Sequence, residues 1–316
     1  MQKVYNKGFS GWGQLGILIG FSGLGLIIGG MVSIPIWKIM THGSLMNMEK
    51  DLLKPENVDA VKVIQVISTV FMFLFPTVAY AFICYRNGWG FLGFREKWNV
   101  KHLGIVLLLI ACSFPLMSAL EQINKMIPIS ASLKAKFDAM EKTYNEQVLL
   151  MVQLNSFKQY LSSLLLIAVL PAITEEIAFR GGLQNLLTRW LRSPWAAILI
   201  SSLLFSAIHL SWYGFFVRFF LGAILGTIFY YTKNIWMNIL MHFVNNAIVV
   251  TSLYMTTRSG KPIDLSSEDK IPLWIGGISL VLVLALIRQL IKISPQPEPP
   301  AFFEKDENYI DPENPF

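Results

Sequence analysis

Long apolar stretches, following one another along the chain, are the feature that most limits what this sequence can fold into. The chain has 316 residues, of which 54% are hydrophobic and only 15% are charged, whereas soluble domains carry about a quarter charged residues. Eight stretches approach the roughly 20 residues that a helix needs to cross a bilayer, namely residues 15–37, 62–85, 102–120, 159–176, 194–212, 215–232, 234–254 and 272–292. The sequence therefore predicts an all-α, polytopic transmembrane helix bundle with about eight spans.

The transmembrane domain is expected to cover residues 1–293, and the proline-rich, acidic residues 294–316 are expected to form a disordered tail. The formal net charge of +6 is modest, and the basic residues are scattered among connecting segments, which is typical of headgroup anchors rather than of a nucleic-acid surface. We therefore expect membrane lipids and no nucleic acid as partners. Lys and Arg divide evenly between the two sides, so they do not orient the bundle decisively.

A polar stretch between the third and fourth spans, residues 121–160, has the spacing of a helix. Its apolar residues recur every three or four positions, at Phe137, Met140, Tyr144, Val148 and Met151. An interfacial amphipathic helix that covers a site entrance fits this pattern. A plain structural connector fits it equally well.

Two adjacent glutamates at the end of the fourth span are the most unusual charged groups of the sequence. Glu175 and Glu176 are the only acidic residues between Gln147 and Ile263, and a charge inside a bilayer costs a few kcal/mol, so such residues are functional candidates. They could also cap the span just outside the bilayer. Glu176 and Arg180 are four residues apart and can pair on one helix face. Glu175 points about 100° away from that face, which leaves it free to act as a general base.

Two of the four histidines also fall in apolar spans. His42 and His102 lie in or beside polar connectors, whereas His209 ends the fifth span and His242 lies inside the seventh, with Asn246 on the same helix face. A lone buried histidine is often only a packing element. Two histidines, an asparagine and a carboxylate pair on neighbouring spans are expected to share a cavity, because buried polar groups are costly unless satisfied.

Such a cavity has the parts of a peptide hydrolase that uses no covalent nucleophile. A glutamate and a histidine can deprotonate water, and a histidine and an asparagine can stabilise an oxyanion. A divalent metal such as zinc could bind Glu175, His209 and His242, but no H-E-x-x-H motif is present, so no cofactor is required. The alternatives are a non-catalytic immunity or scaffold protein that keeps the cluster for packing, and a proton-coupled carrier, although no internal repeat supports a carrier.

Three motifs, in order, resemble those of the CPBP family, the CAAX proteases and bacteriocin-processing enzymes that are also called the Abi family. They are "EEIAFR" from Glu175, which fits EExxxR, "FSAIH" from Phe205, which fits FxxxH, and "HFVNN" from His242, which fits a histidine followed four residues later by Asn or Asp. Each motif alone is weak, whereas three in order are specific. The resemblance covers about residues 159–250, the expected catalytic core.

The resemblance implies an intramembrane endopeptidase similar to the type II CAAX prenyl protease, acting on a membrane-associated peptide or protein tail. Glu175 and His209 would activate water, and His242 and Asn246 would form the oxyanion hole. The supporting residues would be Glu176, Arg180 and Phe205. The family was long described as metalloproteases, so a metal stays an option. Because the chain is bacterial in style, we expect it in the cell (inner) membrane, where relatives are associated with processing of, or immunity to, peptide bacteriocins.

Overall fold

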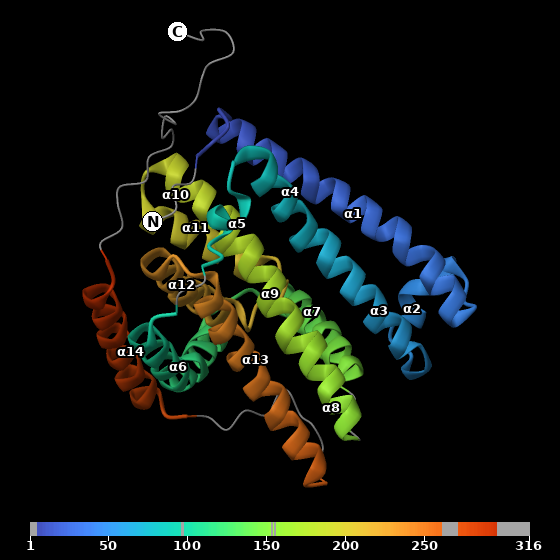
Figure 1. The fold of residues 1–316 in the computed structure, drawn as a ribbon. Coiled ribbons are helices and arrows are strands. Elements are labelled where there is room, and N and C mark those ends of the chain that lie inside the picture. Colours follow the sequence, from blue (N-terminus) through green and yellow to red (C-terminus); the bar gives the residue numbers. More distant parts are fainter. Residues whose placement is uncertain (1–4, 96–97, 153, 155, 261–270, 296–316) are drawn as a thin grey trace, which may run out of the picture.

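The apolar stretches form helices, as they must where no water can satisfy the backbone N–H and C=O groups. The computed structural model describes residues 5–95, 98–152, 154, 156–260 and 271–295 (Figure 1). Within these ranges the chain is helical apart from turns, connections and one isolated bridge between Asn6 and Tyr85. The predicted all-α class is confirmed. Of the predicted tail, residues 296–316 lie outside the described ranges.

Seven helices in the described ranges are long and apolar enough to cross a membrane. They are α1 (Gly11–Thr41), the run Pro55–Cys84 that contains α3 (Val58–Thr69) and α4 (Phe75–Cys84), α6 (Val100–Met126), the run Phe157–Leu191 from α8 to α10, α12 (Phe215–Thr232), α13 (Ile235–Arg258) and α14 (Leu273–Ile293). The shorter elements are η1 (Leu45–Asn47), α2 (Met48–Asp51), η2 (Pro55–Asn57), η3 (Val70–Leu74) and α5 (Gly88–Leu92). The chain is therefore a multi-pass integral membrane protein.

Two expected spans differ from the observed helices. The stretch 194–212 forms α11 (Pro194–Ala207), whose 14 residues span only about 21 Å at 1.5 Å per residue. The helix ends early because the chain turns at Leu210, which has a left-handed φ of 51°, and the following loop replaces the last expected turn. The stretch 159–176 is instead the middle of a 35-residue helical run, Phe157–Leu191.

The helices are arranged as two outer groups with the motif-bearing segment between them (Figure 1). On one side α1 packs along α3 and α4, and on the other side α6 packs along α14. Gly25 of α1 approaches the carbonyl of Phe71 so closely that a Cβ atom would collide with it. An apolar core, which includes Leu109, Leu225 and Leu290, joins α6, α12 and α14. These contacts frame the run from α8 to α13.

The predicted amphipathic helix is α7 (Ala131–Met151), and none of its side chains is fully buried. Phe137 stacks on Trp212 with ring centroids 4.7 Å apart, and the Ser211 hydroxyl donates to Glu141 Oε2 at 2.8 Å. Trp212 and Ser211 belong to the loop between α11 and α12. Thus α7 packs on the loop that follows His209. A plain connector between α6 and α8 would not need these contacts.

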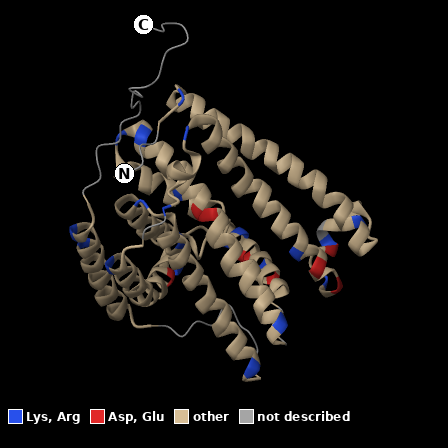
Figure 2. Ribbon diagram, viewed as in Figure 1, with Lys and Arg blue, Asp and Glu red and all other residues tan. Residues whose placement is uncertain are grey.

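Charged residues mostly lie near helix ends and in connections, as a bilayer demands (Figure 2). An acidic position in the middle of the bundle, on the run that contains α9, stands out in the same view. It corresponds to the glutamates at the end of α9 (Leu170–Glu176). The exception to the general distribution of charge is therefore the element that carries the first motif.

Candidate active site

The first motif lies where an α-helix widens into a π-helix. The run Phe157–Leu191 passes through α8 (Phe157–Ser163), η4 (Leu164–Val169), α9, η5 (Ile177–Gln184) and α10 (Asn185–Leu191), and both η4 and η5 are π-helical. π-Helical turns are rare and are frequent at functional sites. Pro171, near the start of α9, lacks an N–H group, which suits the change of hydrogen-bonding pattern there. The two glutamates are thus held between two widened turns.

Glu176 is surrounded by partners. Its Oε1 atom lies 3.0 Å from Arg180 Nη1, and the two side chains are 0% and 1% exposed, so the ion pair predicted from their spacing is confirmed. His242 Nδ1 lies 2.9 Å from the same oxygen, and Asn238 Nδ2 donates to Oε2 at 3.3 Å. The Glu176 carboxylate is therefore neutralised and hydrogen-bonded at both oxygens.

Arg180 extends this cluster to α11 and α12. Its Nη2 atom donates to the Gly222 carbonyl at 3.3 Å, and its guanidinium carbon lies 4.6 Å from the centre of the Phe205 ring. A buried cation is tolerated when it is paired, hydrogen-bonded and placed over an aromatic face. The motif phenylalanine thus contacts the motif arginine, which ties the first two motifs together.

Glu175 differs from its neighbour in both exposure and contacts. Its side chain is 13% exposed, and its Oε2 atom lies 4.0 Å from His242 Nε2, which is too long for a hydrogen bond. No other ion pair or hydrogen bond of this carboxylate occurs in the part of the chain that the structure describes. The Glu175 carboxylate therefore keeps its oxygens available to a small molecule.

His209 follows the end of α11 and is fixed by its own helix. Its Nδ1 atom lies 2.7 Å from the Phe205 carbonyl oxygen. Because a carbonyl can only accept, Nδ1 carries the proton, and Nε2 of the neutral ring is left as an acceptor. The Phe205 ring lies between the two histidines, with centroids 5.0 Å from His209 and 6.0 Å from His242. No direct hydrogen bond joins His209 to Glu175 within the described residues.

The third motif lies on α13 and approaches the first from the opposite side. The two ring nitrogens of His242 face the two glutamates, Nδ1 towards Glu176 and Nε2 towards Glu175. Asn246, one turn further, donates from Nδ2 to the carbonyl of Ile167 in η4 at 3.2 Å. The structure therefore brings the three motifs together, with Asn246 at the edge of the cluster.

The other two histidines lie elsewhere. His102 is buried at the start of α6 and shares a hydrogen bond of 3.1 Å with the Ser294 hydroxyl. His42 is the left-handed residue that ends α1. Both therefore have local structural surroundings, as expected from the sequence.

Two residues of the cluster were not among the sequence-predicted candidates. Asn238 donates to Glu176 and also to the Leu225 carbonyl at 2.7 Å. It precedes His242 by four residues, so the same spacing that linked His242 to Asn246 could have found it. Arg218 is a lone cation in an apolar span and lies within electrostatic reach of Glu175 and His209. Arg218 could have been identified from the sequence, because a charged residue in an apolar span is energetically costly.

Within the described residues, Glu175, His209 and His242 do not form a group spaced to hold a metal ion. Nδ1 of His242 is engaged by Glu176 and Nδ1 of His209 by the Phe205 carbonyl, which leaves Nε2 as the free nitrogen of each ring. No group of three or more His, Cys, Asp or Glu side chains in the described ranges is spaced to hold a metal ion. Structural and catalytic zinc sites need at least three converging protein ligands. We therefore derive no step through a metal.

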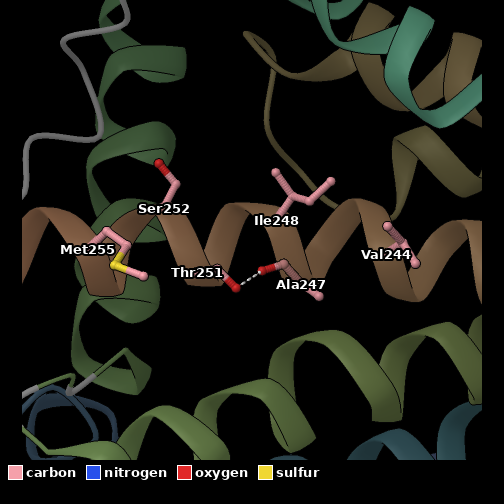
Figure 3. A pocket seen from close by; sticks show the side chains of 6 residues that line it. All are labelled: Val244, Ala247, Ile248, Thr251, Ser252 and Met255. Carbon is pink, nitrogen blue, oxygen red and sulfur yellow. Dashed lines mark hydrogen bonds between the residues drawn. The ribbon is translucent and has the colours of Figure 1, made fainter.

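A pocket of about 390 Å³ opens along α13, beginning two residues beyond His242. Figure 3 shows its lining, which is formed by Val244, Ala247, Ile248, Thr251, Ser252 and Met255. The Thr251 hydroxyl donates to the Ala247 carbonyl at 2.6 Å, so it offers little free polarity. The pocket is thus a mainly apolar surface on the helix that carries the third motif.

Residues 157–248 match a protein-family model described as "Type II CAAX prenyl endopeptidase Rce1-like". The matched segment starts with α8, ends within α13 and contains all three motifs. Comparison with curated proteins and with solved structures gives no match. Residues 157–248 of this multi-pass membrane protein are therefore similar to the Rce1-like domain of type II CAAX prenyl endopeptidases.

Proposed function

We propose that this chain is an intramembrane endopeptidase that hydrolyses a peptide bond with a water molecule activated by Glu175 and His209. The observation that carries the proposal is the difference between the two glutamates. Glu176 is fully buried and bound by three side chains, whereas Glu175 is partly exposed and has only a 4.0 Å contact to His242. A carboxylate held in place without a partner is suited to accept a proton from a bound molecule.

In the proposed reaction, water binds between the Glu175 carboxylate and Nε2 of His209. Glu175 accepts one proton, and the water oxygen attacks the carbonyl carbon of the peptide bond, whose π electrons move to the carbonyl oxygen. When the C–N bond breaks, the nitrogen leaves as an amine with the proton returned by Glu175. The tautomer imposed on His209 by the Phe205 carbonyl supports this role, because it leaves Nε2 as an acceptor.

The oxyanion would be stabilised by His242 and Asn246. Glu176 accepts from the Nδ1–H group of His242 at 2.9 Å, so the proposed oxyanion donor is the ring with a second proton, on Nε2. Nε2–H of that ring, on the side of Glu175, then becomes a donor to the developing negative charge. Asn246 can contribute its second amide hydrogen, since Nδ2 carries two and one is donated to Ile167.

The substrate would be a membrane-associated peptide or protein tail, and the chain would act in a bacterial cell membrane. The multi-pass fold and the apolar pocket on α13 support a substrate that reaches the site from the lipid phase. Neither a metal nor another cofactor enters the proposed reaction. Activity in the presence of a strong zinc chelator should equal the untreated activity, and a loss that added zinc restores would overturn this part.

The test compares membrane peptides from cells that express the wild-type chain with those from cells that express Glu175→Gln. Fragments present only with the wild type would reveal both the activity and its substrate. His209→Ala should abolish the same fragments without lowering the amount of folded protein in detergent. His42→Ala, at an exposed helix end, is the matched control and should behave as wild type.

Cleavage at the wild-type rate by Glu175→Gln or His209→Ala would contradict the proposed mechanism. A non-catalytic packing role predicts a different outcome, in which the same substitutions lower thermal stability and no fragment is found for the wild type. A carrier predicts substrate flux across vesicles that collapses with the pH gradient. Peptide fragments thus identify a peptidase, a change in thermal stability identifies a packing role, and flux across vesicles identifies a carrier.

A further inference from the structure

Three basic side chains meet at the end of the bundle where α10 ends and α13 begins. They are Arg95, in the connection between α5 and α6, Arg189, in the last turn of α10, and Lys233, in the turn between α12 and α13. The charges of Arg189 and Arg95 both act on Lys233. Within the described residues, none of the three forms an ion pair with Asp or Glu. The fold thus gathers three like charges from segments that are distant in sequence.

Close backbone contacts fix the segments that carry Arg95 and Lys233. The Gly93 carbonyl, two residues before Arg95, accepts from the Ile235 N–H group, two residues after Lys233, at 2.9 Å. A Cβ atom at Gly93, whose φ is 88°, would collide with the ring of Phe229 in the last turn of α12. Glycine allows both this left-handed φ and this close approach. The connection that carries Arg95 is therefore held against the turn that carries Lys233.

Arg189 is held beside the same connection. Its guanidinium carbon lies 5.6 Å from the centre of the Tyr85 ring and 5.8 Å from the centre of the Phe91 ring in α5. One turn earlier in α10, Asn185 donates from Nδ2 to the Phe91 carbonyl at 2.6 Å. Two aromatic faces and this hydrogen bond therefore place Arg189 against α5, and an aromatic face supplies no full negative charge.

Lys233 shows what this arrangement costs. Its Nζ atom lies 4.3 Å from the centre of the Tyr230 ring, and burial, followed by the charges of Arg189 and Arg95, lowers its pKa to about 8. Like charges within reach of one another destabilise a fold unless an anion neutralises them. A lysine that only anchored a helix end would extend into the headgroup region, away from other cations. The crowding of the three charges therefore indicates a site for an anion.

Exposed tryptophans lie on the same segments as the three cations. Trp89 in α5, Trp98 just before α6 and Trp236 in the first turn of α13 are 49%, 50% and 38% exposed. The Phe94 ring joins two of them, with its centroid 5.1 Å from that of Trp89 and 5.4 Å from that of Trp236. Tryptophan is enriched at the headgroup level of a bilayer. The cluster therefore lies at the depth of the lipid headgroups, at an end of the bundle where Figure 2 shows basic positions without acidic ones among the described residues.

We propose that Arg95, Arg189 and Lys233 bind the phosphate group of an anionic membrane lipid. A phosphate offers several oxygens to guanidinium and ammonium donors, and guanidinium–phosphate hydrogen bonds are strong and directional. Basic sites between transmembrane helices bind anionic headgroups in this way. Inorganic phosphate has the same chemistry, and the exposed tryptophans favour the lipid. The site goes beyond the proposed peptidase reaction, because none of the motif residues takes part in it.

The test measures thermal unfolding of the full chain in an uncharged detergent and in a buffer without phosphate. Dioleoylphosphatidylglycerol, which is anionic, is compared with dioleoylphosphatidylcholine, which is zwitterionic, and with inorganic phosphate at the same concentration. At about a hundred times Kd, a ligand of the folded state should raise the melting temperature by roughly 5 °C. We expect this rise with phosphatidylglycerol and with neither of the other two. Native mass spectrometry should show one phosphatidylglycerol molecule retained by the chain in the same detergent.

Arg95→Gln, Arg189→Gln and Lys233→Met should each lower this rise by at least half, whereas Arg95→Lys, which keeps the charge, should preserve most of it. Lys233→Met excludes a purely structural role, because it should raise the melting temperature without lipid and lower the rise that phosphatidylglycerol causes. Arg258→Gln, at the far end of α13, and Lys38→Gln, in the last turn of α1, are the matched controls and should leave the rise unchanged. If a helix variant does not fold, the two Arg95 variants carry the test, since Arg95 lies in a connection.

Equal rises with phosphatidylglycerol and phosphatidylcholine would overturn the proposal. A rise of the same size with inorganic phosphate would overturn it as well, because the cluster would then bind a soluble anion. Equal losses in the cluster variants and in the two controls would have the same consequence, since a general attraction to anionic lipids would then explain the rise. A rise that only the cluster variants lose supports the lipid site. These results do not depend on peptide cleavage, so failure of the proposed peptidase function is distinguishable from failure of the lipid site.

Discussion

Glu175 and Glu176 are neighbours in sequence and occupy opposite environments. The Glu176 side chain is 0% exposed and contacts a cation, an imidazole and an amide. The Glu175 side chain is 13% exposed, and the one ion-pair contact that it makes within the described residues is 4.0 Å long. On a helix, adjacent residues point about 100° apart, so one side chain can enter a packed cluster while the next makes few polar contacts.

The comparison shows how a membrane protein can keep a carboxylate with few contacts inside its bundle. A buried ion is stable when its partners replace the water that it lost, and it is then unavailable for chemistry. In this site the stabilising contacts are concentrated on Glu176 and Arg180, which fix the backbone of α9 and η5. Glu175 is positioned by that backbone and keeps its oxygens free.

The largest expected effect separates the two residues by activity. Glu175→Gln should lower kcat by about a thousandfold or more, since general-base catalysis typically contributes about 10²–10⁴-fold. Its melting temperature in detergent should stay close to that of the wild type, because the carboxylate has no hydrogen bond to lose within the described part of the chain. Initial-rate measurements and thermal unfolding on the same preparation test both statements. A stable Glu175→Gln variant that retains half of the wild-type activity would contradict the proposed role of Glu175 as general base.

Glu176→Gln should act mainly on stability. It leaves the Arg180 guanidinium buried without its counter-ion, and breaking a buried ion pair on one side costs about 3–5 kcal/mol. The double variant Glu176→Gln/Arg180→Met should be more stable than Glu176→Gln alone, because it removes the orphaned charge. Chemical or thermal unfolding in detergent measures the difference. If the double variant is the less stable of the two, the unpaired charge of Arg180 is not the cause of the lower stability of Glu176→Gln.

A smaller effect is expected from the amide that supports Glu176. Asn238→Ala removes one hydrogen bond to the Glu176 carboxylate and one to the Leu225 carbonyl. Loss of such bonds to buried groups costs about 1–3 kcal/mol. Asn246→Ala should cost less stability, because Asn246 lies at the edge of the cluster, and more activity, because it is the proposed oxyanion donor. The opposite ranking in paired stability and rate measurements would assign the support role to Asn246.

The last prediction concerns a buried cation that has no carboxylate partner within the described residues. Lys233, between α12 and α13, has a pKa lowered to about 8, chiefly by burial and then by the charges of Arg189 and Arg95. The folded state thus favours the neutral amine, so the free energy of unfolding should rise with pH from about 8 to the ordinary value of 10.5. Lys233→Met should remove this slope and raise the melting temperature at pH 7. An unchanged slope in a pH series of melting curves would assign it to another group.

The sequence by itself determined the helical class and the approximate spans, because a bilayer requires about 20 apolar residues with internally satisfied backbone groups. It also determined the Glu176–Arg180 pair, since both residues lie four apart on one helix and no tertiary contact is needed to bring them together. The motif residues were found for the same reason, because polar side chains in apolar spans are costly and so are informative.

Only the tertiary structure decided which of these groups meet. The π-helical turns around α9, the early end of α11 at Ala207 and the position of α7 over the His209 loop arise from packing between helices that are distant in sequence. The same packing turns one ring nitrogen of His242 to each glutamate, and it leaves Arg218 Nη1 without a hydrogen-bond partner among the described residues. A pattern along one helix defines which residues share a face, whereas the partner across the bundle depends on how several helices pack at once. For this reason the motifs could be recognised from the sequence, and the unequal environments of Glu175 and Glu176 could be measured only in the folded chain.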